Sequence, residues 1–412
     1  MAVAAAGPTL VGMTTITERK RLTAIRAAWL FDGVGPGLVP DPTVVLDGST
    51  IVAVGPSVPV PDGAIVVDLA GATLLPGLVD AHVHLCFDAS DDAVGNLAAR
   101  DDAEAYVAMT AAARAMAHGG VTTVRDLGDR GYLSLGVRAA AATAPTLPEI
   151  LAAGPPITTP GGHCHFLGVE AAGVDGVRAA VREHAERGVD VIKIMASGGN
   201  MTPGSRPELP QYGPAELRAA VEEAHRHNLP ITAHAHATQS IVDGLEAGLD
   251  GFEHMSFMTA DGVDPIPAEV LTGLVRRGVT VSLTLGLAPG PGTAPPPGML
   301  ARMPAMVANC QRVYAAGARI VVGSDAGIGA VKPPDVIRWA GPQLRQLGMG
   351  GAEALATCTS RAASALGLGH RKGRLAPGYD ADLLAVDGDP LTDPAALHAI
   401  RAVYVRGTAI RN

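Results

Sequence analysis

The middle of the chain alternates short apolar runs with segments whose apolar residues recur at helical spacing. The apolar runs predict eight strands, over residues 79–85, 121–126, 149–154, 189–196, 230–236, 251–255, 280–285 and 318–325. One intervening segment has apolar residues at i, i+3, i+4 and i+7, namely Leu217, Ala220, Val221 and Ala224. Eight strands, each followed by helical sequence, are what an α/β protein of the (β/α)8 TIM barrel type contains. We therefore expect this fold over residues 77–366. A doubly wound open sheet is the alternative.

Both ends of the chain differ from this middle part, because they consist of short β segments broken by turns. The turn signals near the N-terminus are Asp32-Gly33, Asp47-Gly48 and Asp62-Gly63. Near the other end, residues 382–386 and 402–405 are predicted strands. We therefore expect residues 21–76 and 367–412 to form one small β-sandwich domain, with residues 1–20 as a loose N-terminal tail.

Composition narrows the classes of function. Only 3% of the 412 residues are aromatic, so small aliphatic side chains must fill the core. A net charge of −9 gives no basic patch for nucleic acid. The four cysteines are widely spaced, so neither a disulfide framework nor a thiolate zinc site is expected. Since no apolar run reaches the ~18 residues of a membrane span, we expect a cytoplasmic protein without membrane contact.

Histidines gather where the predicted strands end. His82 and His84 end the first strand, and their imidazoles point the same way because side chains alternate along a strand. The fifth strand repeats this pattern with His234 and His236, and His254 ends the sixth. Neutral imidazole is a preferred zinc ligand, so a metal site at the mouth of the barrel is expected. For each motif alone, surface or core histidines are the alternative.

Lys193 lies inside the apolar run of the fourth strand, in a chain with four lysines. A buried amine is costly unless its charge is paired or removed. One interpretation is an ion pair with an acid such as Asp126. The other is a desolvated, nucleophilic amine that reacts with CO2 and gives a carbamate, an anionic ligand shared by two metals. The nearby histidines and Asp325 favour the carbamate.

Asp325 follows the eighth strand, where it is a candidate metal ligand and general base, with a helix cap as the alternative. The loop after the third strand carries His163 and His165. Seven of the thirteen histidines thus lie at strand ends or in this loop, a clustering that dispersed core histidines would not show. The remaining histidines fall on helices or connections, and we interpret them as structural: His118, His184, His225, His227, His370 and His398.

The segment 77–84 resembles the first-strand motif of the metal-dependent amidohydrolase superfamily. Lys193, His234, His254 and Asp325 follow in the order that this family uses for its fourth, fifth, sixth and eighth strands. The resemblance covers nearly the whole chain. It implies two divalent metal ions, usually zinc, held by six ligands: His82, His84 and Asp325 on the more buried ion, His234 and His254 on the other, and carboxylated Lys193 on both.

Residues 191–199 and the Gly-Gly-His loop at 161–163 resemble the imidazolonepropionase-like branch, with its Xaa-Pro dipeptidases (prolidases) and ochratoxin-hydrolysing amidases. That branch implies cleavage of an amide next to a carboxylate, in a small dipeptide or N-acyl amino acid, by hydroxide between two metals. His163 would polarise the scissile carbonyl, and His236 would face the substrate carboxylate. His165 and Tyr212 are further expected substrate contacts. Asn200, Met201, Ser256, Phe257 and Met258 depart from the pattern, which leaves the substrate open.

Other reactions remain open on such a site. Hydrolases of a cyclic amide, a lactone or a carbamate would use the same metals, as would a cyclase or dehydratase. A mononuclear deaminase needs no bridging lysine, so Lys193 argues against it. A non-catalytic scaffold would lack ligands, whereas every expected ligand is present here. The chain shows no specific signal for an interface, and a homo-oligomer stays a prediction.

Overall fold

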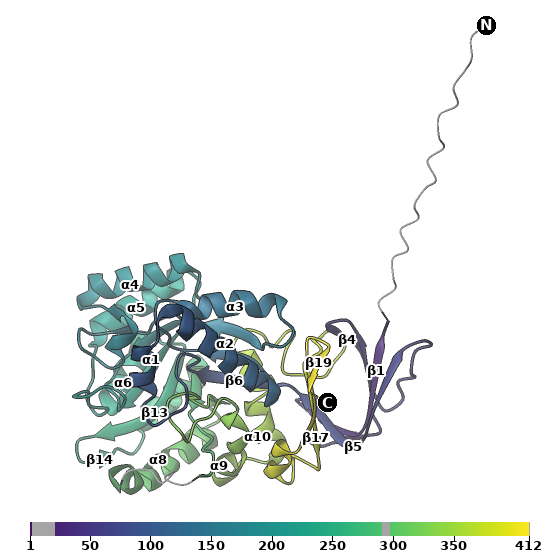
Figure 1. Ribbon diagram of the computed structural model, residues 1–412. Helices are drawn as coiled ribbons and strands as arrows, with labels where there is room; N and C mark the ends of the chain where they lie inside the picture. The colour runs from purple at the N-terminus through teal and green to yellow at the C-terminus, as the bar shows by residue number, and fades with distance from the viewer. Residues whose placement is uncertain (2–20, 291–296, 412) are drawn as a thin grey trace.

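The computed structural model describes Met1, residues 21–290 and residues 297–411. The tail expected over residues 1–20 therefore lies, apart from Met1, outside the described residues. In Figure 1 a mixed α/β part and a smaller β part lie side by side.

Parallel strands form the centre of the larger part. They are β6 (Leu78–Val83), β7 (Val121–Asp126), β8 (Glu149–Ala152), β11 (Ile192–Met195), β12 (Ile231–Ala237), β13 (Gly251–Thr259), β15 (Thr280–Leu283) and β16 (Arg319–Val322). The first three pair in chain order, and so do the last five. The amide of Asp190, before β11, donates to the carbonyl of Ala152 at the end of β8 over 2.9 Å. A parallel bridge joins Val83 of β6 to Ala326 after β16.

Each of the eight predicted strands overlaps one of these observed strands, in an arrangement of the TIM-barrel type. Because neighbouring strands follow the order of the chain, the doubly wound alternative, in which strand order reverses, does not fit. The prediction of β13 was too short, because the strand continues to Thr259 and pairs there with β14 (Gly262–Val263). Two further short strands, β9 (Ile157–Thr158) and β10 (Val169–Glu170), extend the sheet beside β11.

Helices connect the strands and cover the sheet (Figure 1). They are α1 (Ala93–Ala99), α2 (Asp102–His118), α3 (Leu133–Thr143), α4 (Gly173–Arg187), α5 (Pro214–Arg226), α6 (Thr238–Ala247), α7 (Ala268–Arg277), α8 (Pro297–Ala315), α9 (Gly341–Gln346), α10 (Gly351–Thr357) and α11 (Ser360–Ala365). In α5 the predicted apolar stripe is buried, and Pro214 occupies the first turn, where its missing N–H costs no helical hydrogen bond. Asp101 and Glu104 cap α2 reciprocally, which fixes its start.

Both chain ends build the smaller part. Its strands are β1 (Thr23–Leu30), β2 (Val39–Pro40), β3 (Thr43–Asp47), β4 (Thr50–Gly55), β5 (Ile65–Pro76), β17 (Leu383–Asp387), β18 (Ile400–Val405) and β19 (Thr408–Arg411). They form one continuous hydrogen-bonded sheet in the order β19-β18-β17-β5-β1-β3-β4, with β2 on β1. The two ends meet where β5 pairs antiparallel with β17. This sheet has a small core of its own, which includes Ile25, Val44, Ile51, Leu74 and Leu383.

A buried cluster of charges links the two parts. Lys372 is 2% exposed, and its Nζ lies 3.2 Å from Glu149 of β8, 3.0 Å from Asp380 and 2.5 Å from Asp382. Arg371 pairs with Glu149 and Asp380 at the edge of the cluster. Burial alone would lower the pKa of Lys372, but the carboxylates raise it above its ordinary value, so the amine is charged at neutral pH.

Replacing this cation tests how much the link contributes to stability. We expect Lys372→Met to lower the free energy of unfolding by about 3–5 kcal/mol, because it leaves buried carboxylates without their cation. Denaturant unfolding followed by circular dichroism measures the loss. Arg361→Met is the matched control, since it removes an exposed pair with Glu353 that is worth less than about 1 kcal/mol. Equal effects of the two substitutions would contradict this account.

Candidate metal centre

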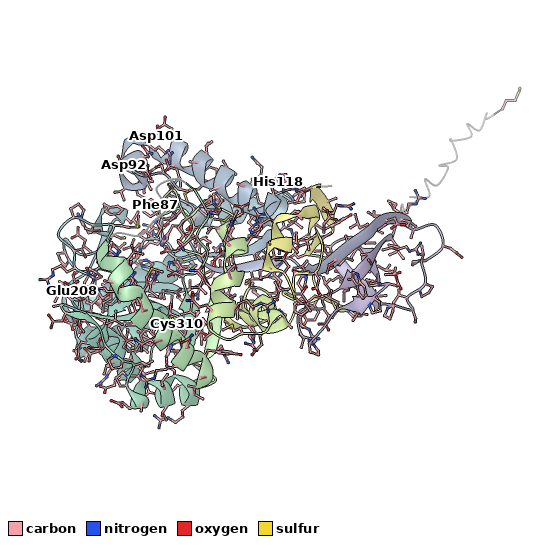
Figure 2. The ribbon with its side chains drawn as sticks, turned by 90° about the horizontal axis from the view of Figure 1, so that it is seen from below. Phe87, Asp92, Asp101, His118, Glu208 and Cys310 are labelled. Carbon is pink, nitrogen blue, oxygen red and sulfur yellow. The ribbon has the colours of Figure 1, made fainter. Side chains whose placement is uncertain are left out.

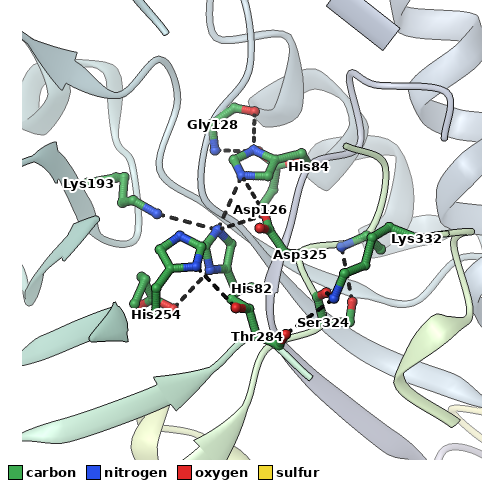
Figure 3. A network of polar contacts seen from close by, with 12 residues as sticks. His82, His84, Asp126, Gly128, Lys193, His254, Thr284, Ser324, Asp325 and Lys332 are labelled. Carbon is green, nitrogen blue, oxygen red and sulfur yellow. Dashed lines mark hydrogen bonds and ion pairs between the residues drawn. The ribbon is translucent and has the colours of Figure 1, made fainter. Parts of the chain in front are cut away.

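Side chains of ligand type meet at the C-terminal ends of the parallel strands (Figure 3). β6 and the residue after it supply the first pair of histidines, β12 the second, and β13 and the segment after β16 the others. They form two clusters, and within each cluster the ligand atoms lie within 4.8 Å of one another. The first consists of His82, His84 and Asp325, and the second of His234, His236 and His254.

In the first cluster, three acceptor atoms face one another. Nε2 of His82 lies 3.2 Å from Nε2 of His84, and Oδ1 of Asp325 lies 3.5 Å and 3.4 Å from these two nitrogens. Nδ1 of His84 lies 3.1 Å from the carbonyl oxygen of Gly128, which only accepts hydrogen bonds. Nδ1 of His82 lies 3.0 Å from a carboxylate oxygen of Glu253. Nδ1 of His84 therefore carries the proton and its Nε2 presents a lone pair, and the carboxylate next to Nδ1 of His82 favours the same tautomer in that ring.

This donor set fits a divalent cation. Burial lowers the pKa of His82 to about 4, so its imidazole is neutral at pH 7. Two lone pairs and a carboxylate oxygen then point at one small volume and repel one another unless a cation lies between them. Imidazole nitrogens and a carboxylate, with the other imidazole nitrogen held by an acceptor, are typical of zinc sites.

The second cluster has the same character. Nε2 of His234 lies 3.0 Å from the carbonyl oxygen of Gly198, so this nitrogen carries the proton and Nδ1 presents the lone pair. The rings of His234 and His254 have centroids 4.6 Å apart, and those of His236 and His254 are stacked at 4.5 Å. Burial holds the pKa values of His234 and His254 well below their ordinary value, which keeps these imidazoles neutral. The structure thus places His236, predicted as a substrate contact, beside two predicted ligands.

Lys193 adjoins the first cluster, and its Nζ lies 3.4 Å from Nε2 of His82 (Figure 3). The residue is 1% exposed, and burial lowers the pKa of its amine. Within the described parts of the chain, no ion pair joins this amine to a carboxylate. The alternative of a pair with Asp126 is not realised, because Asp126 accepts hydrogen bonds from the amides of Leu85 and Gly128 instead.

A buried ion pair that was not predicted from the sequence contacts His82. Glu253 of β13 contacts Nδ1 of His82, accepts from Thr232 Oγ1 over 2.7 Å, and pairs with Arg125 of β7 at 2.9 Å. Arg125 also donates to the carbonyl of Ala81 over 2.8 Å. The sequence did contain a sign of this pair. Glu253 and Arg125 are charged residues inside two apolar strands, where an unpaired charge would be costly.

The backbone at the site is closely packed and locally strained. His254 and Asp325 have positive φ angles of 68° and 61°, a conformation that few non-glycine residues adopt. A Cβ at Gly323 would lie 2.3 Å from the Cβ of His82, and one at Gly199 would lie 2.3 Å from Nε2 of His163. Glycine at these two positions therefore lets the chain approach the histidines.

The clusters lie in a cavity of about 930 Å³, which Lys193 and His163 also line. Figure 2 labels two residues of its wall, Phe87 and Cys310 of α8. Burial lowers the pKa of His163 to about 3, and its ring lies 4.8 Å from that of His234. Lys332, which the sequence interpretation also passed over, lines the cavity and donates to the carbonyls of Ser324 and Thr284 over 2.7 Å and 3.2 Å.

Two predicted substrate contacts are not supported by their positions. Tyr212 is buried, and its hydroxyl donates to the carbonyl of Ala171 over 2.9 Å. This hydroxyl therefore binds the backbone before α4 rather than a substrate. His165 begins a short 3-10 helix (His165–Leu167) and is not among the residues that line the cavity. Cys86 and Cys164 are buried, which agrees with the packing role expected for them, and Cys164 also touches the cavity.

Residues 73–410 match the model of the amidohydrolase family, and the chain belongs to this family. It is 26% identical over 423 residues to the ochratoxinase of Aspergillus niger, covering 94% of this chain and 85% of that protein. It is 25% identical to the imidazolonepropionase of Deinococcus radiodurans over 402 residues, covering 90% and 93% of the two chains. These similarities identify the branch within the family.

Solved structures agree with this assignment. A Xaa-Pro dipeptidase with bound methionine in the active site superposes with a TM-score of 0.82 at 25% identity, covering 95% of this chain and all of the other. The crystal structure of A. niger ochratoxinase gives a TM-score of 0.80 at 25% identity, over 95% and 96%. The protein is therefore a hydrolase acting on carbon–nitrogen bonds, in a superfamily that generally uses divalent metals. In the described residues no helix is long and apolar enough to cross a membrane.

The contact between Glu253 and His82 predicts a measurable loss of metal affinity. We expect Glu253→Gln to weaken metal binding by roughly 10–100-fold, because the amide no longer fixes the Nδ1–H tautomer of His82 as a carboxylate does. Competition titration with a chromogenic chelator measures the affinity. Glu183→Gln on the outer face of α4 is the control and should leave it unchanged. Wild-type affinity in Glu253→Gln would show that this contact does not support a ligand.

Proposed function

We propose that this protein is a binuclear metal-dependent hydrolase that cleaves an amide bond next to a carboxylate, as dipeptidases and N-acyl amino acid hydrolases do. The observation that carries the proposal is Lys193. It is a buried amine with no ion pair to a carboxylate among the described residues, its Nζ lies 3.4 Å from Nε2 of His82, and it lines the same cavity as both histidine clusters. Conversion to a carbamate would remove an unpaired buried charge and create an anionic ligand for both clusters.

In this proposal His82, His84 and Asp325 hold one ion, and His234 and His254 hold the other. Carboxylated Lys193 contributes to both. Zinc suits this set, because nitrogen and carboxylate ligands predominate and no thiolate takes part. His236 supports the second cluster, where its Nδ1 lies 2.9 Å from Oγ of Ser256.

Bound divalent cations supply Lewis acidity and lower the pKa of water towards neutrality. The residues of the chain carry out the remaining steps. Asp325 accepts the proton of the attacking water and passes it to the leaving nitrogen. His163 donates a hydrogen bond to the carbonyl oxygen and stabilises the negative charge that develops there. Burial keeps His163 neutral, so that it binds an oxyanion by hydrogen bonding without a fixed charge.

Charge in the cavity supports a substrate with a carboxylate. Lys332 lines the cavity, is buried, and within the described residues pairs with no acid. His236 lines the same cavity and is neutral, because burial lowers its pKa to about 4, so it can offer a hydrogen bond to a substrate. Among similar structures, a prolidase complexed with N-methylphosphonate-L-proline is 28% identical with a TM-score of 0.79. That ligand also combines an amino acid with a tetrahedral group.

The proposal extends to the architecture. We infer a closed (β/α)8 barrel over residues 77–366 and a β-sandwich domain from residues 21–76 and 367–412. The bridge between Val83 and Ala326 and the hydrogen bond between Asp190 and Ala152 support closure of the barrel. The separate small core of the terminal sheet supports the second domain.

A substrate screen tests the reaction class. We expect hydrolysis of N-acyl amino acids and dipeptides, with much slower turnover of the matching C-terminal carboxamides, because these lack the carboxylate. Removal of metal by a chelator should abolish turnover, and added zinc should restore it. Activity confined to cyclic amides, lactones, carbamates or aminated rings would overturn the proposal in favour of the alternative reactions. A mononuclear deaminase is disfavoured by Lys193.

His163 provides a second test of the mechanism. We expect His163→Asn to lower kcat by roughly 10²–10³-fold, the usual effect of removing one donor to an oxyanion. His118→Asn, at the exposed end of α2, should keep wild-type turnover. Steady-state kinetics on the best substrate of the screen, at matched metal content, measures both. An unchanged kcat in His163→Asn would remove this residue from the mechanism.

A further inference from the structure

The wall of the cavity is unusually rich in methionine. Six of the chain's twelve methionines line it. They come from β11, the loop that follows, β13 and α8, and are Met195, Met201, Met258, Met299, Met303 and Met306. Among the described lining residues Phe87 is the single phenylalanine, tyrosine or tryptophan. Apart from the histidines and Phe87, the wall is therefore built from flexible side chains rather than flat rings.

Helix α8 presents one face to this cavity. Its lining residues are spaced i, i+4, i+7, i+8 and i+11, which places them on a single helical face: Met299, Met303, Met306, Val307 and Cys310. Asn309 holds the helix in place, because it accepts from the amide of Ile266 over 2.9 Å and donates to the carbonyl of Asp264 over 2.7 Å. The orientation of the face thus follows from a buried polar anchor.

The methionines on this face are only partly covered. Met299, Met303 and Met306 are half-buried, whereas Met195 and Met258 nearer the strands are buried. Leu285, Leu287, Ile328 and Leu347 also line the cavity. Burying such half-exposed apolar surface against a ligand is favourable, at about 25 cal/mol per Å² of area removed from water. Unbranched thioether side chains repack around apolar ligands of different shapes.

The ligand-type side chains and the partly covered methionines of this cavity come from different elements. The histidine clusters, Lys193 and Asp325 come from the strand ends, while the partly covered methionines come from α8. A cavity of about 930 Å³ is near the upper end of the range for sites that bind drug-sized ligands, and it is far larger than a short dipeptide needs. A substrate held by its carboxylate near Lys332 and the histidines leaves the apolar space to its acyl side.

We infer that the methionine face of α8 selects substrates with a long apolar acyl group, so that the natural substrate class is N-acyl amino acids with medium to long acyl chains. This inference rests on the proposed function, because it specifies the substrate of the same site. Short dipeptides are then poor substrates, since they leave the half-buried methionines uncovered.

A chain-length series tests the inference. With one amino acid kept constant, kcat/KM should rise by about 4-fold for each CH2 added to the acyl chain from acetyl upwards, until the cavity is filled. A value of kcat/KM that is flat or falls with chain length would overturn the inference while leaving amide hydrolysis intact.

Substitutions on α8 locate the effect. Met303→Gln and Met306→Gln conserve length but place an amide in the apolar wall. They should lower the ratio of decanoyl to acetyl kcat/KM by at least 10-fold. Leu300→Gln, on an exposed residue of the same helix that does not line the cavity, is the matched control. An unchanged ratio in both methionine variants would contradict the assignment to this face.

Binding to the metal-loaded enzyme separates this inference from the proposed function. N-decylsulfonylglycine and N-methylsulfonylglycine keep the carboxylate but have no amide to hydrolyse. We expect calorimetry to show at least about 10²-fold tighter binding of the decyl compound, lost in Met303→Gln. Tighter binding without any amide hydrolysis would contradict the proposed function and leave only the preference of the methionine face for a long apolar group. Equal binding of the two compounds, in an enzyme that hydrolyses amides, would sink the inference alone.

Discussion

Two imidazole nitrogens aimed at each other at 3.2 Å are the constraint on which the rest of the site depends. Each ring has its Nδ1 next to an acceptor, which turns its Nε2 towards the other ring, and burial keeps the imidazole of His82 neutral. Such a geometry is repulsive in the protein alone and becomes favourable around a cation. The packing that holds the ring of His82 extends through Glu253 of β13 to Arg125 of β7.

That arrangement explains several local costs of the fold. The ion pair between Glu253 and Arg125 takes two charges out of water, and it is retained where one carboxylate oxygen contacts His82 and the other contacts the guanidinium. Positive φ angles occur at His254 and Asp325, whose side chains lie at the C-terminal ends of the parallel strands. Glycines at 199 and 323 remove the Cβ atoms that would displace His163 and His82. Stability is given up at each of these positions to hold the site in one geometry.

Much of this could be predicted from the sequence, for definite reasons. Strand alternation puts His82 and His84 on one face, and it does the same for His234 and His236, which lie together in the second cluster. The order of apolar runs predicted the eight main parallel strands of the larger part, but not the short strands β9 and β10. The features that could not be predicted depend on contacts between segments far apart in the sequence. The pairing of Glu253 with Arg125 joins β13 to β7, and nothing in either strand specifies the other.

Loops were harder to predict than strands. Tyr212 was expected at the substrate, but its hydroxyl satisfies a backbone carbonyl, and His165 lies outside the cavity lining. The methionines that line the cavity could not be predicted as a group for a related reason. Its members are scattered over residues 195 to 306, and only the packing of α8 against β13 and β14 brings them to one cavity.

The central claim is that Lys193 joins two metal ions as a carbamate. Metal content per chain, measured on the fully loaded protein together with its intact mass under native conditions, tests this most directly. The account predicts two ions per chain and a Lys193 heavier by one CO2, with the added mass lost on acidification. A single ion per chain with unmodified Lys193 in a fully loaded sample would contradict it.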